Sequence, residues 1–240
     1  MKLQLPTIII VCLSIVLIII IYTFVGKNTE YTLDTTDESA NFSLIRVDAA
    51  NAYNAQDYTQ AIELYEQAFD LRPENAEVCN DLAAAHYDLA LKFAGPEWPS
   101  WPVIISDGSV AEALVELNRA YKHVESGYLV VETESSEIAK AVENNAKEKG
   151  ASVYPYRGNK KYILNILIGS TKDHLEQAKT LYLQAIELKS TYAAPYRNLG
   201  SLYVKIGLTE NAINYLAEAY KRDPSDTELG DYLHQQKLNY

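Results

Sequence analysis

The side chains that most often carry catalysis are thinly spread along this 240-residue chain. Its four histidines, His86, His123, His174 and His234, are scattered, and no two stand four residues apart, as a zinc site on one helix face requires. The sequence contains no HExxH, CxxC, GxGxxG, GxSxG or P-loop pattern. We therefore expect no enzymatic activity, no catalytic residue, no bound metal and no cofactor.

The isolated histidines and cysteines are better explained by roles in the structure than by chemistry. His86 shares an apolar helical face with Leu82 and Leu89, so we expect a packed or hydrogen-bonded core histidine rather than a ligand. Of the two cysteines, Cys12 lies in the apolar N-terminal run and Cys79 in a predicted helix, so no intrachain disulfide is expected.

Both tryptophans, Trp98 and Trp101, lie in the segment GPEWPSWPV, whose three prolines predict an ordered or semi-rigid loop. Tryptophan is enriched in interface hot spots and at membrane interfaces, so the loop could bind a partner or a ligand. Equally, both rings could fold back onto the helical core. The sequence leaves the two alternatives open.

The elements that must position any binding residue are clearest in residues 193–226. At helical spacing this stretch predicts two antiparallel helices joined by a short turn at Gly207 and stopped by Pro224. Small residues recur where the helices must approach closely, and large ones fill the remaining space. The pattern consists of Tyr196, Leu199, Gly200 and Tyr203 on the first helix and Ala212, Leu216 and Ala219 on the second.

These residue types at this spacing resemble the tetratricopeptide repeat (TPR), a helix-turn-helix unit of about 34 residues. The resemblance implies an all-α solenoid, because one such unit cannot bury its apolar face alone and needs stacked neighbours. A second match is Ala61, Tyr65, Ala68 and Pro73. Two further units are expected, each with an irregularity. In one, the second helix contains Ala113, Leu117 and Ala120; in the other, the segment YILNILIG forms a buried first helix ahead of Ala178, Tyr182 and Ala185.

Residues 128–158 fit no repeat. Ser135–Lys149 is compatible with a helix closed at Gly150, while the flanking YLVV and SVYPY segments are strand-like in composition. Either an extra helical hairpin or a small insertion with extended arms is possible.

The predicted organisation is a transmembrane anchor (1–26), a flexible acidic linker (27–41), a solenoid (42–226) and a capping helix (227–240). Within the solenoid we place repeats at 42–75, 76–127 with a loop insertion at 89–106, 159–192 and 193–226, and the insertion at 128–158.

The resemblance also implies a binding surface, because TPR proteins bind extended peptides or helices on the concave surface lined by their first helices. Here that surface is expected to include Asn80, Tyr87, Arg197, Asn198, Ser201 and Val204. Arg197 can offer a forked donor to a carboxylate or carbonyl, and Asn198 can donate and accept at once. Chaperone-binding members hold a C-terminal carboxylate with Lys and Asn side chains. Arg46, Asn80, Arg197 and Asn198 are fragments of such a set.

The N-terminus predicts a membrane segment. No charged side chain occurs from Leu3 to Gly26, and the apolar run 8–25 spans about 27 Å as a helix, close to a bilayer core of about 30 Å. A cleaved signal would have a shorter apolar core and small residues at its end, which TFVG does not supply. We expect an uncleaved single-pass anchor with the N-terminus in the cytoplasm and the soluble domain outside; Lys2 and Lys27 barely separate the two orientations.

The formal net charge of −11 argues against nucleic acid as a partner, since an acidic surface repels phosphate. It mildly favours basic peptide partners, but a solvated acidic surface is the more ordinary explanation of such a charge. The main functional hypothesis is a membrane-anchored adaptor that binds a protein or peptide partner in its groove. The alternative is a receptor for a small ligand or cell-envelope fragment that uses the Trp98/Trp101 loop.

Overall fold

The computed structural model describes residues 35–96, 102–104, 108–158 and 160–238. The predicted anchor (3–26), Trp98 and Trp101 lie outside this described part of the chain. Among the residues that are described, no helix is both long enough and apolar enough to cross a bilayer. The chain divides into two compact units, Met1–Leu44 and Ile45–Tyr240.

The predicted linker (27–41) ends earlier than expected, because helix α2 (Thr35–Asn54) already includes its last residues. Polar residues such as Ser39 continue this helix, since extending an existing helix adds one hydrogen bond for each residue that becomes fixed. Ser43 Oγ donates to the Ser39 carbonyl at 2.9 Å within it. Polar composition alone therefore did not locate the start of the helix.

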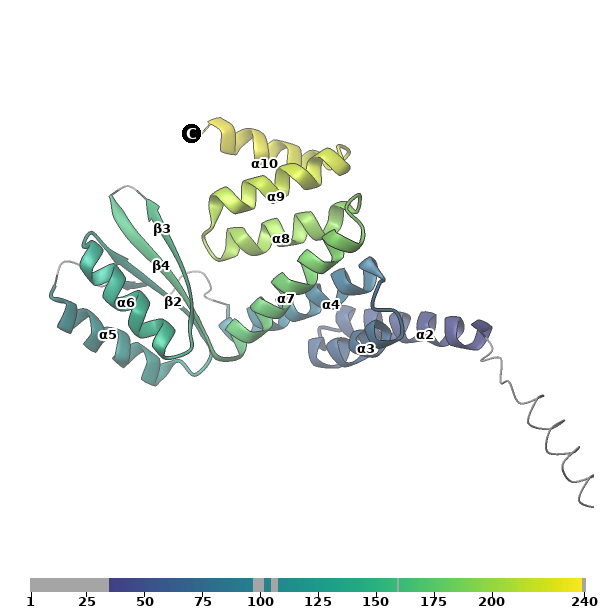
Figure 1. Cartoon of the computed structure of the whole chain (residues 1–240), viewed down its shortest axis with the longest axis horizontal. Coiled ribbons are helices and arrows are strands. Elements are labelled where there is room, and N and C mark those ends of the chain that lie inside the picture. Colours follow the sequence, from purple (N-terminus) through teal and green to yellow (C-terminus); the bar gives the residue numbers. More distant parts are fainter. Residues whose placement is uncertain (1–34, 97–101, 105–107, 159, 239–240) are drawn as a thin grey trace, which may run out of the picture. The chain divides into compact units, whose positions relative to one another are not determined.

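Helical hairpins make up most of the second unit (Figure 1). After α2 they comprise α3 (Tyr58–Leu71), α4 (Ala76–Ala94), α7 (Gly169–Leu188), α8 (Ala193–Lys205), α9 (Thr209–Arg222) and α10 (Thr227–Leu238). Asp57 and Asn75 cap the starts of α3 and α4 with their side-chain oxygens. From α3 onward each of these helices packs against the next, α4 against α7 included. The predicted TPR-like helical fold is confirmed for these elements.

The crossing of α8 and α9 shows why small residues recur in the pattern. A Cβ atom added at Gly200 would lie 2.6 Å from Leu216 Cγ, so the two helices approach too closely for a larger residue. Ala212 is fully buried and Ala219 is 2% exposed. Gly207 ends the first helix with φ +78°, a conformation that side-chain-bearing residues rarely adopt.

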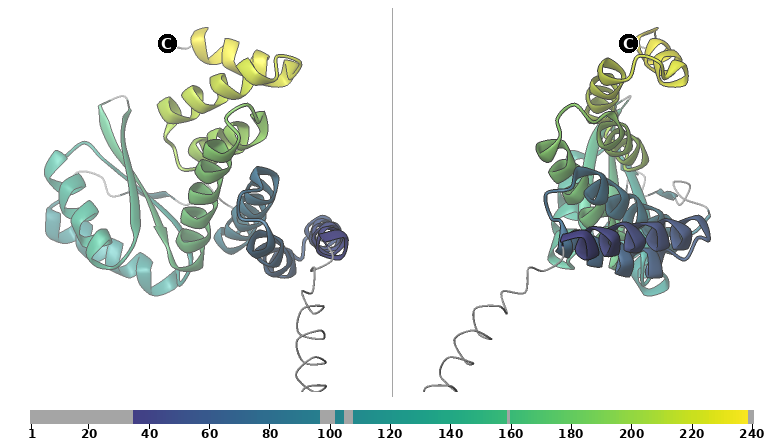
Figure 2. Two further views of the ribbon diagram at one scale, coloured as in Figure 1. Left: turned by 45° about the vertical axis from the view of Figure 1, so that its right-hand side comes forward. Right: turned by 90° about the vertical axis from the view of Figure 1, so that its right-hand side faces the viewer.

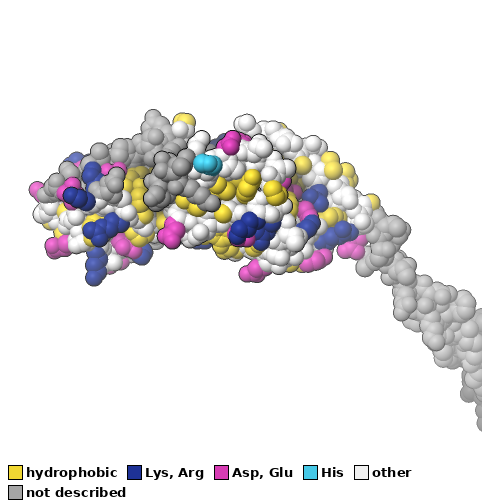
Figure 3. Space-filling model, turned by 90° about the horizontal axis from the view of Figure 1, so that it is seen from above, with side chains coloured by type: hydrophobic (Ala, Val, Ile, Leu, Met, Phe, Trp, Pro, Cys, Tyr) yellow, Lys and Arg dark blue, Asp and Glu magenta, His cyan; other side chains and the backbone are white. Residues whose placement is uncertain are grey.

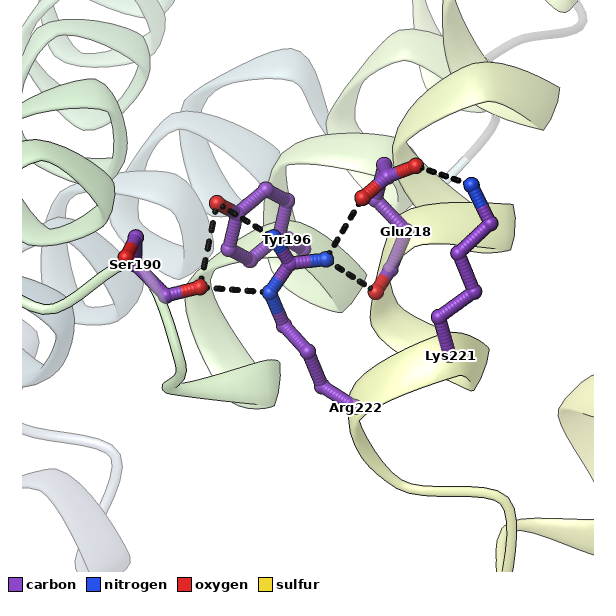
Figure 4. A network of polar contacts seen from close by, with 5 residues as sticks. All are labelled: Ser190, Tyr196, Glu218, Lys221 and Arg222. Atoms are coloured by element: carbon purple, nitrogen blue, oxygen red, sulfur yellow. Dashed lines mark hydrogen bonds and ion pairs between the residues drawn. The ribbon is translucent and has the colours of Figure 1, made fainter.

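Arg222 ties the same hairpin together (Figure 4). Its guanidinium lies 3.8 Å from the Tyr196 ring centroid and donates to the Tyr196 hydroxyl at 3.0 Å. It also donates to the Ser190 carbonyl at 2.5 Å and to the Glu218 carboxylate at 2.7 Å. Tyr196 is therefore a buried packing residue held by α9, not part of the exposed groove.

The described residues between α4 and α7 form an α/β unit, and we call the segment 95–168 the inserted unit. It contains β1 (Pro102–Ile104), α5 (Val110–His123), β2 (Gly127–Thr133), α6 (Ser136–Glu148), β3 (Ser152–Gly158) and β4 (Lys161–Ile168). The strand order is β1-β2-β4-β3, with β1 parallel to β2 and the other pairs antiparallel. Helices α5 and α6 cover one face of the sheet, and α7 lies along the other (Figure 2).

Alternate residues of β2 and β4 serve two different cores. Leu129 and Ile166 pack with α5 and α6, whereas Tyr128 and Leu167 join the core formed by α4, α7 and α8. Asn165, 2% exposed, donates from Nδ2 to the Ile206 carbonyl at 2.6 Å and accepts from the Tyr128 hydroxyl at 2.7 Å. The inserted unit is thereby hydrogen-bonded to the turn that follows α8.

Three predictions are corrected here. The all-α class did not include the sheet. All of YILNILIG except its last residue, Gly169, lies in strand β4 and not in a helix. Because both faces of this strand are buried, its sequence lacks the alternation that would distinguish it. Residues 110–123 are helical, but this helix, α5, packs on α6 and β1. The place beside α4 that we expected α5 to occupy is taken by α7. The repeat that starts with α4 is thus completed after the inserted unit. The predicted helix 135–149 is confirmed as α6, and its flanks are extended.

Candidate functional site

A row of hydrogen-bonded polar side chains crosses the first helices of the three hairpins. Arg46 Nη2 on α2 lies 3.3 Å from Asp81 Oδ2 on α4. Asn80 donates to Asp81 at 3.3 Å and accepts from Asn198 Nδ2 on α8 at 3.0 Å. We call these four residues the polar row. Two residues predicted from separate repeats, Asn80 and Asn198, are therefore in direct contact.

The sequence separations in these contacts confirm that the helices occupy equivalent places. The Arg46–Asp81 and Tyr53–Asp88 pairs are each 35 residues apart, whereas Asn80 and Asn198 are 118 apart. The difference between the two separations is 83 residues, more than the 74 residues of the inserted unit, because α4 and α7 are also longer than α8 and α9. Without these extra residues, the sequence separation between equivalent residues of α4 and α8 would equal that between α2 and α4.

The remaining predicted residues differ in exposure. Arg197, with its side chain 49% exposed, pairs with Asp226 at 3.0 Å and with Glu228 at 3.7 Å. Ser201 is exposed and donates to the Arg197 carbonyl at 3.0 Å. Tyr87 is half-buried against the main core. The roles assigned to these residues remain predictions.

Acidic side chains contact two of the residues that were predicted to bind a partner. Arg46 and Arg197, two of the clamp-like residues, already contact carboxylates of this chain. Burial raises the pKa of Asp81, while Asn80 and the Arg46 cation lower it. A free C-terminal carboxylate would have to compete with these internal acids, which disfavours a clamp of the chaperone-binding kind. Figure 3 shows acidic and basic side chains interspersed over the face seen from the α10 end.

Sequence reasoning missed Asp88, which lies on α4 two turns after Asp81. Its carboxylate accepts a hydrogen bond from the Tyr53 hydroxyl, and burial raises its pKa. The signal that could have found it is its separation of 35 residues from Tyr53, the same as between Arg46 and Asp81.

Other titratable groups in the described part of the chain serve packing. His86 and His174 join α4 to α7 through their Nδ1 atoms, 2.9 Å apart, and Phe93 stacks on His174. Burial, together with His174, lowers the pKa of His86 to about 4. Burial raises the pKa of the Cys79 thiol to about 11, so it is a poor nucleophile. Among the described residues, no three His, Cys, Asp or Glu side chains could hold a metal ion together.

A cavity of about 480 Å³ lies where α4 ends and β2 begins. Phe93 and Tyr128 form part of its wall, together with the charged side chains of Lys122 and Glu125. The cavity is separate from the polar row, since it shares none of the residues of that row.

Comparison with protein families supports the repeat assignment. The tetratricopeptide repeat family model matches residues 51–75 and 193–226, which contain α3 and the α8–α9 hairpin. The two matched segments cover about a quarter of the chain. Comparison with curated proteins gives no match.

Several solved structures of TPR domains align with this chain. The first TPR of Spaghetti (RPAP3), bound to an HSP90 peptide, is 12% identical, with 84% of this chain and 96% of that chain covered and a TM-score of 0.46. The Arabidopsis OM64 TPR domain is 10% identical, with 83% and 98% covered and a TM-score of 0.45. The TPR2B domain of yeast Sti1, in its pHsp70 complex, is 10% identical, with 84% and 99% covered and a TM-score of 0.43. TM-scores below 0.5 say nothing about what this chain binds.

Proposed function

We propose that the protein is a non-catalytic adaptor whose groove, lined by α2, α4 and α8, binds an extended segment of a partner protein. The observation that supports this most directly is the polar row, which brings side chains of three helices into one line of donors and acceptors. An extended backbone exposes donors and acceptors along its length, which such a row can match. Exposed Ser201 and Val204 on α8 extend the surface beyond the row.

We further propose that residues 3–26 anchor the chain in a membrane, with the repeats on the extracytoplasmic side. The support is the uncharged run from Leu3 to Gly26. N-terminal sequencing of the mature protein tests the anchor, since chains that begin near Lys27 would show that the segment is removed. Protease digestion of sealed vesicles of known orientation tests the side, because only repeats on the exposed face are cleaved.

The groove is tested by site-specific photocrosslinking in native membranes. Val204 in the groove (45% exposed) and Val115 on α5 (58% exposed) form a matched pair of exposed valines. With a photoreactive residue at each position in turn, a partner should crosslink from position 204 and not from position 115. Equal crosslinking from both positions would contradict a binding site in the groove.

A double substitution tests whether the predicted contact residues take part in binding the partner. Arg197→Ala together with Asn198→Ala should weaken crosslinking from position 204. Asn198 donates to the buried Asn80 side chain, and an acceptor left unpaired there costs about 1–3 kcal/mol. The double variant should therefore melt roughly 2–12 °C lower, and crosslinking is measured well below that temperature. Lys221→Ala, which removes a more exposed cation on α9, is the control. Undiminished crosslinking in the double variant would move the contact to other residues.

A further inference from the structure

We propose that the cavity at the end of α4 and the start of β2, here called the α4–β2 cavity, binds a free amino acid with an aromatic side chain. This ligand carries one positive charge, one negative charge and an apolar ring, and the cavity offers a contact for each. The α4–β2 cavity shares no residue with the polar row, so the proposal stands apart from the function proposed for the groove.

Two side chains of opposite charge line the α4–β2 cavity. Lys122 lies near the end of α5, and Glu125 follows two residues after that helix. Neither forms an ion pair, with the other or with any further residue in the described part of the chain. Both charges are therefore available to a ligand.

These two charges select for a zwitterion. A simple anion would be attracted by Lys122 and repelled by Glu125, and a simple cation would experience the reverse. A molecule with both a carboxylate and an ammonium group can satisfy the two side chains at once, with a charge-assisted hydrogen bond to each. The α-carboxylate and α-ammonium groups of a free amino acid meet this requirement.

The rest of the lining accommodates an apolar group. Phe93 and Tyr128 contribute rings to it, and Ala94 and Val124 contribute aliphatic atoms. Phe93 stacks on His174 with ring centroids 5.7 Å apart and an angle of 2° between the ring planes, yet it remains 45% exposed. A ligand can still cover much of the Phe93 ring. An aromatic side chain is favoured there, because pairs of aromatic rings attract each other beyond the apolar area that they bury.

The wall of the α4–β2 cavity between α5 and β2 is held against α7. The backbone N–H of Thr171 donates to Ser126 Oγ at 2.9 Å. A Cβ atom added at Gly169 would lie 2.4 Å from the carbonyl oxygen of Glu125, so the start of α7 lies directly against this wall. A wall that is already fixed loses little conformational freedom when a ligand binds, which favours binding.

The size of the α4–β2 cavity fits a small molecule. Its volume of about 480 Å³ lies within the range of about 300–1,000 Å³ that is usual for small-molecule sites. An aromatic amino acid occupies part of this volume and leaves room for water molecules that bridge it to the polar lining.

Equilibrium dialysis of the purified full chain in detergent against labelled L-phenylalanine tests the proposal. L-phenylalanine should bind. As competitors, 3-phenylpropanoate lacks the ammonium group and 2-phenylethylamine lacks the carboxylate, so each should bind about tenfold more weakly, the effect of one charge-assisted contact. Glycine carries both charges without a ring and should also bind more weakly. An analogue with only one charge that binds as well as L-phenylalanine would overturn the assignment of a zwitterion, and equal binding of glycine would overturn the role of the ring.

Two variants locate the site. Lys122→Gln and Glu125→Gln should each weaken L-phenylalanine binding about tenfold. Both side chains are exposed, so the melting temperature should stay nearly unchanged. Lys140→Gln and Glu137→Gln, at exposed positions on α6 outside the cavity, are the matched controls and should bind as the unsubstituted chain does. Undiminished binding in the two cavity variants, or no binding to the unsubstituted chain, would overturn the site. Crosslinking from position 204 tests the groove independently of either result.

Discussion

Replacing Asn165 by alanine should uncouple the inserted unit from the repeats. The Asn165 amide donates to the Ile206 carbonyl and accepts from the Tyr128 hydroxyl. Ile206 is fully buried, so its carbonyl cannot turn to water when the amide is removed. A buried acceptor left without its donor costs about 1–3 kcal/mol, and losing the hydrogen bond from Tyr128 adds about 0.5–1.5 kcal/mol. We expect a total loss of roughly 2–4 kcal/mol.

Urea unfolding of the full chain, followed by far-ultraviolet circular dichroism, measures this loss. In a protein of this size each kcal/mol shifts the melting temperature by about 2–4 °C, so Asn165→Ala should melt roughly 5–15 °C lower. Asn144→Ala, an exposed asparagine on α6, is the matched control and should stay within about 0.5 kcal/mol. A variant at position 165 as stable as this control would refute the reasoning, because the amide would then make no net contribution to holding the inserted unit.

Two further predictions concern the helical core. Ala212→Leu should destabilise the α8–α9 hairpin by about 1–3 kcal/mol through overpacking, since Ala212 is fully buried; a denaturation midpoint equal to that of Ala111→Leu, at an exposed site, would contradict this. The pKa of His86 is about 4 when folded and near 6.5 when unfolded, so its contribution to stability is complete above pH 6.5 and is lost as the pH falls toward 4. His86→Gln should therefore flatten the decline of the unfolding free energy between pH 7 and pH 5, and a decline as steep as that of the unsubstituted chain would contradict this.

How much of the fold was predictable depended on whether a repeat is continuous in sequence. The α8–α9 hairpin was predicted in full because Gly200, Ala212 and Pro224 mark its crossing and its end within one stretch. The repeat of α4 and α7 was misassigned because its two helices are separated by the inserted unit, and amphipathic α5 offered the expected small residues nearer in sequence. Strand β4 was misread because burial on both faces removes the alternation by which a strand is recognised.

The residues of the candidate site were likewise predictable only within a single repeat. Asn80 and Asn198 were identified singly, because each occupies a first-helix position of its own repeat. Their contact could not be predicted, since it depends on α7 bringing α8 beside α4. Asp88 was missed because a lone acid on a helix resembles a solvated surface residue, and only the tertiary structure places it against the Tyr53 hydroxyl.

The interruption of one repeat also affects how the chain can assemble during synthesis. In an uninterrupted solenoid, the second helix of each repeat follows the first after a few residues. Here α4 emerges with its apolar face complete, but α7 follows only after residues 95–168. At about 5–20 residues per second, that interval lasts roughly 4–15 s. During it α3 is the partner already available to α4, and the surface that α7 will cover stays open to chaperones or to other nascent chains.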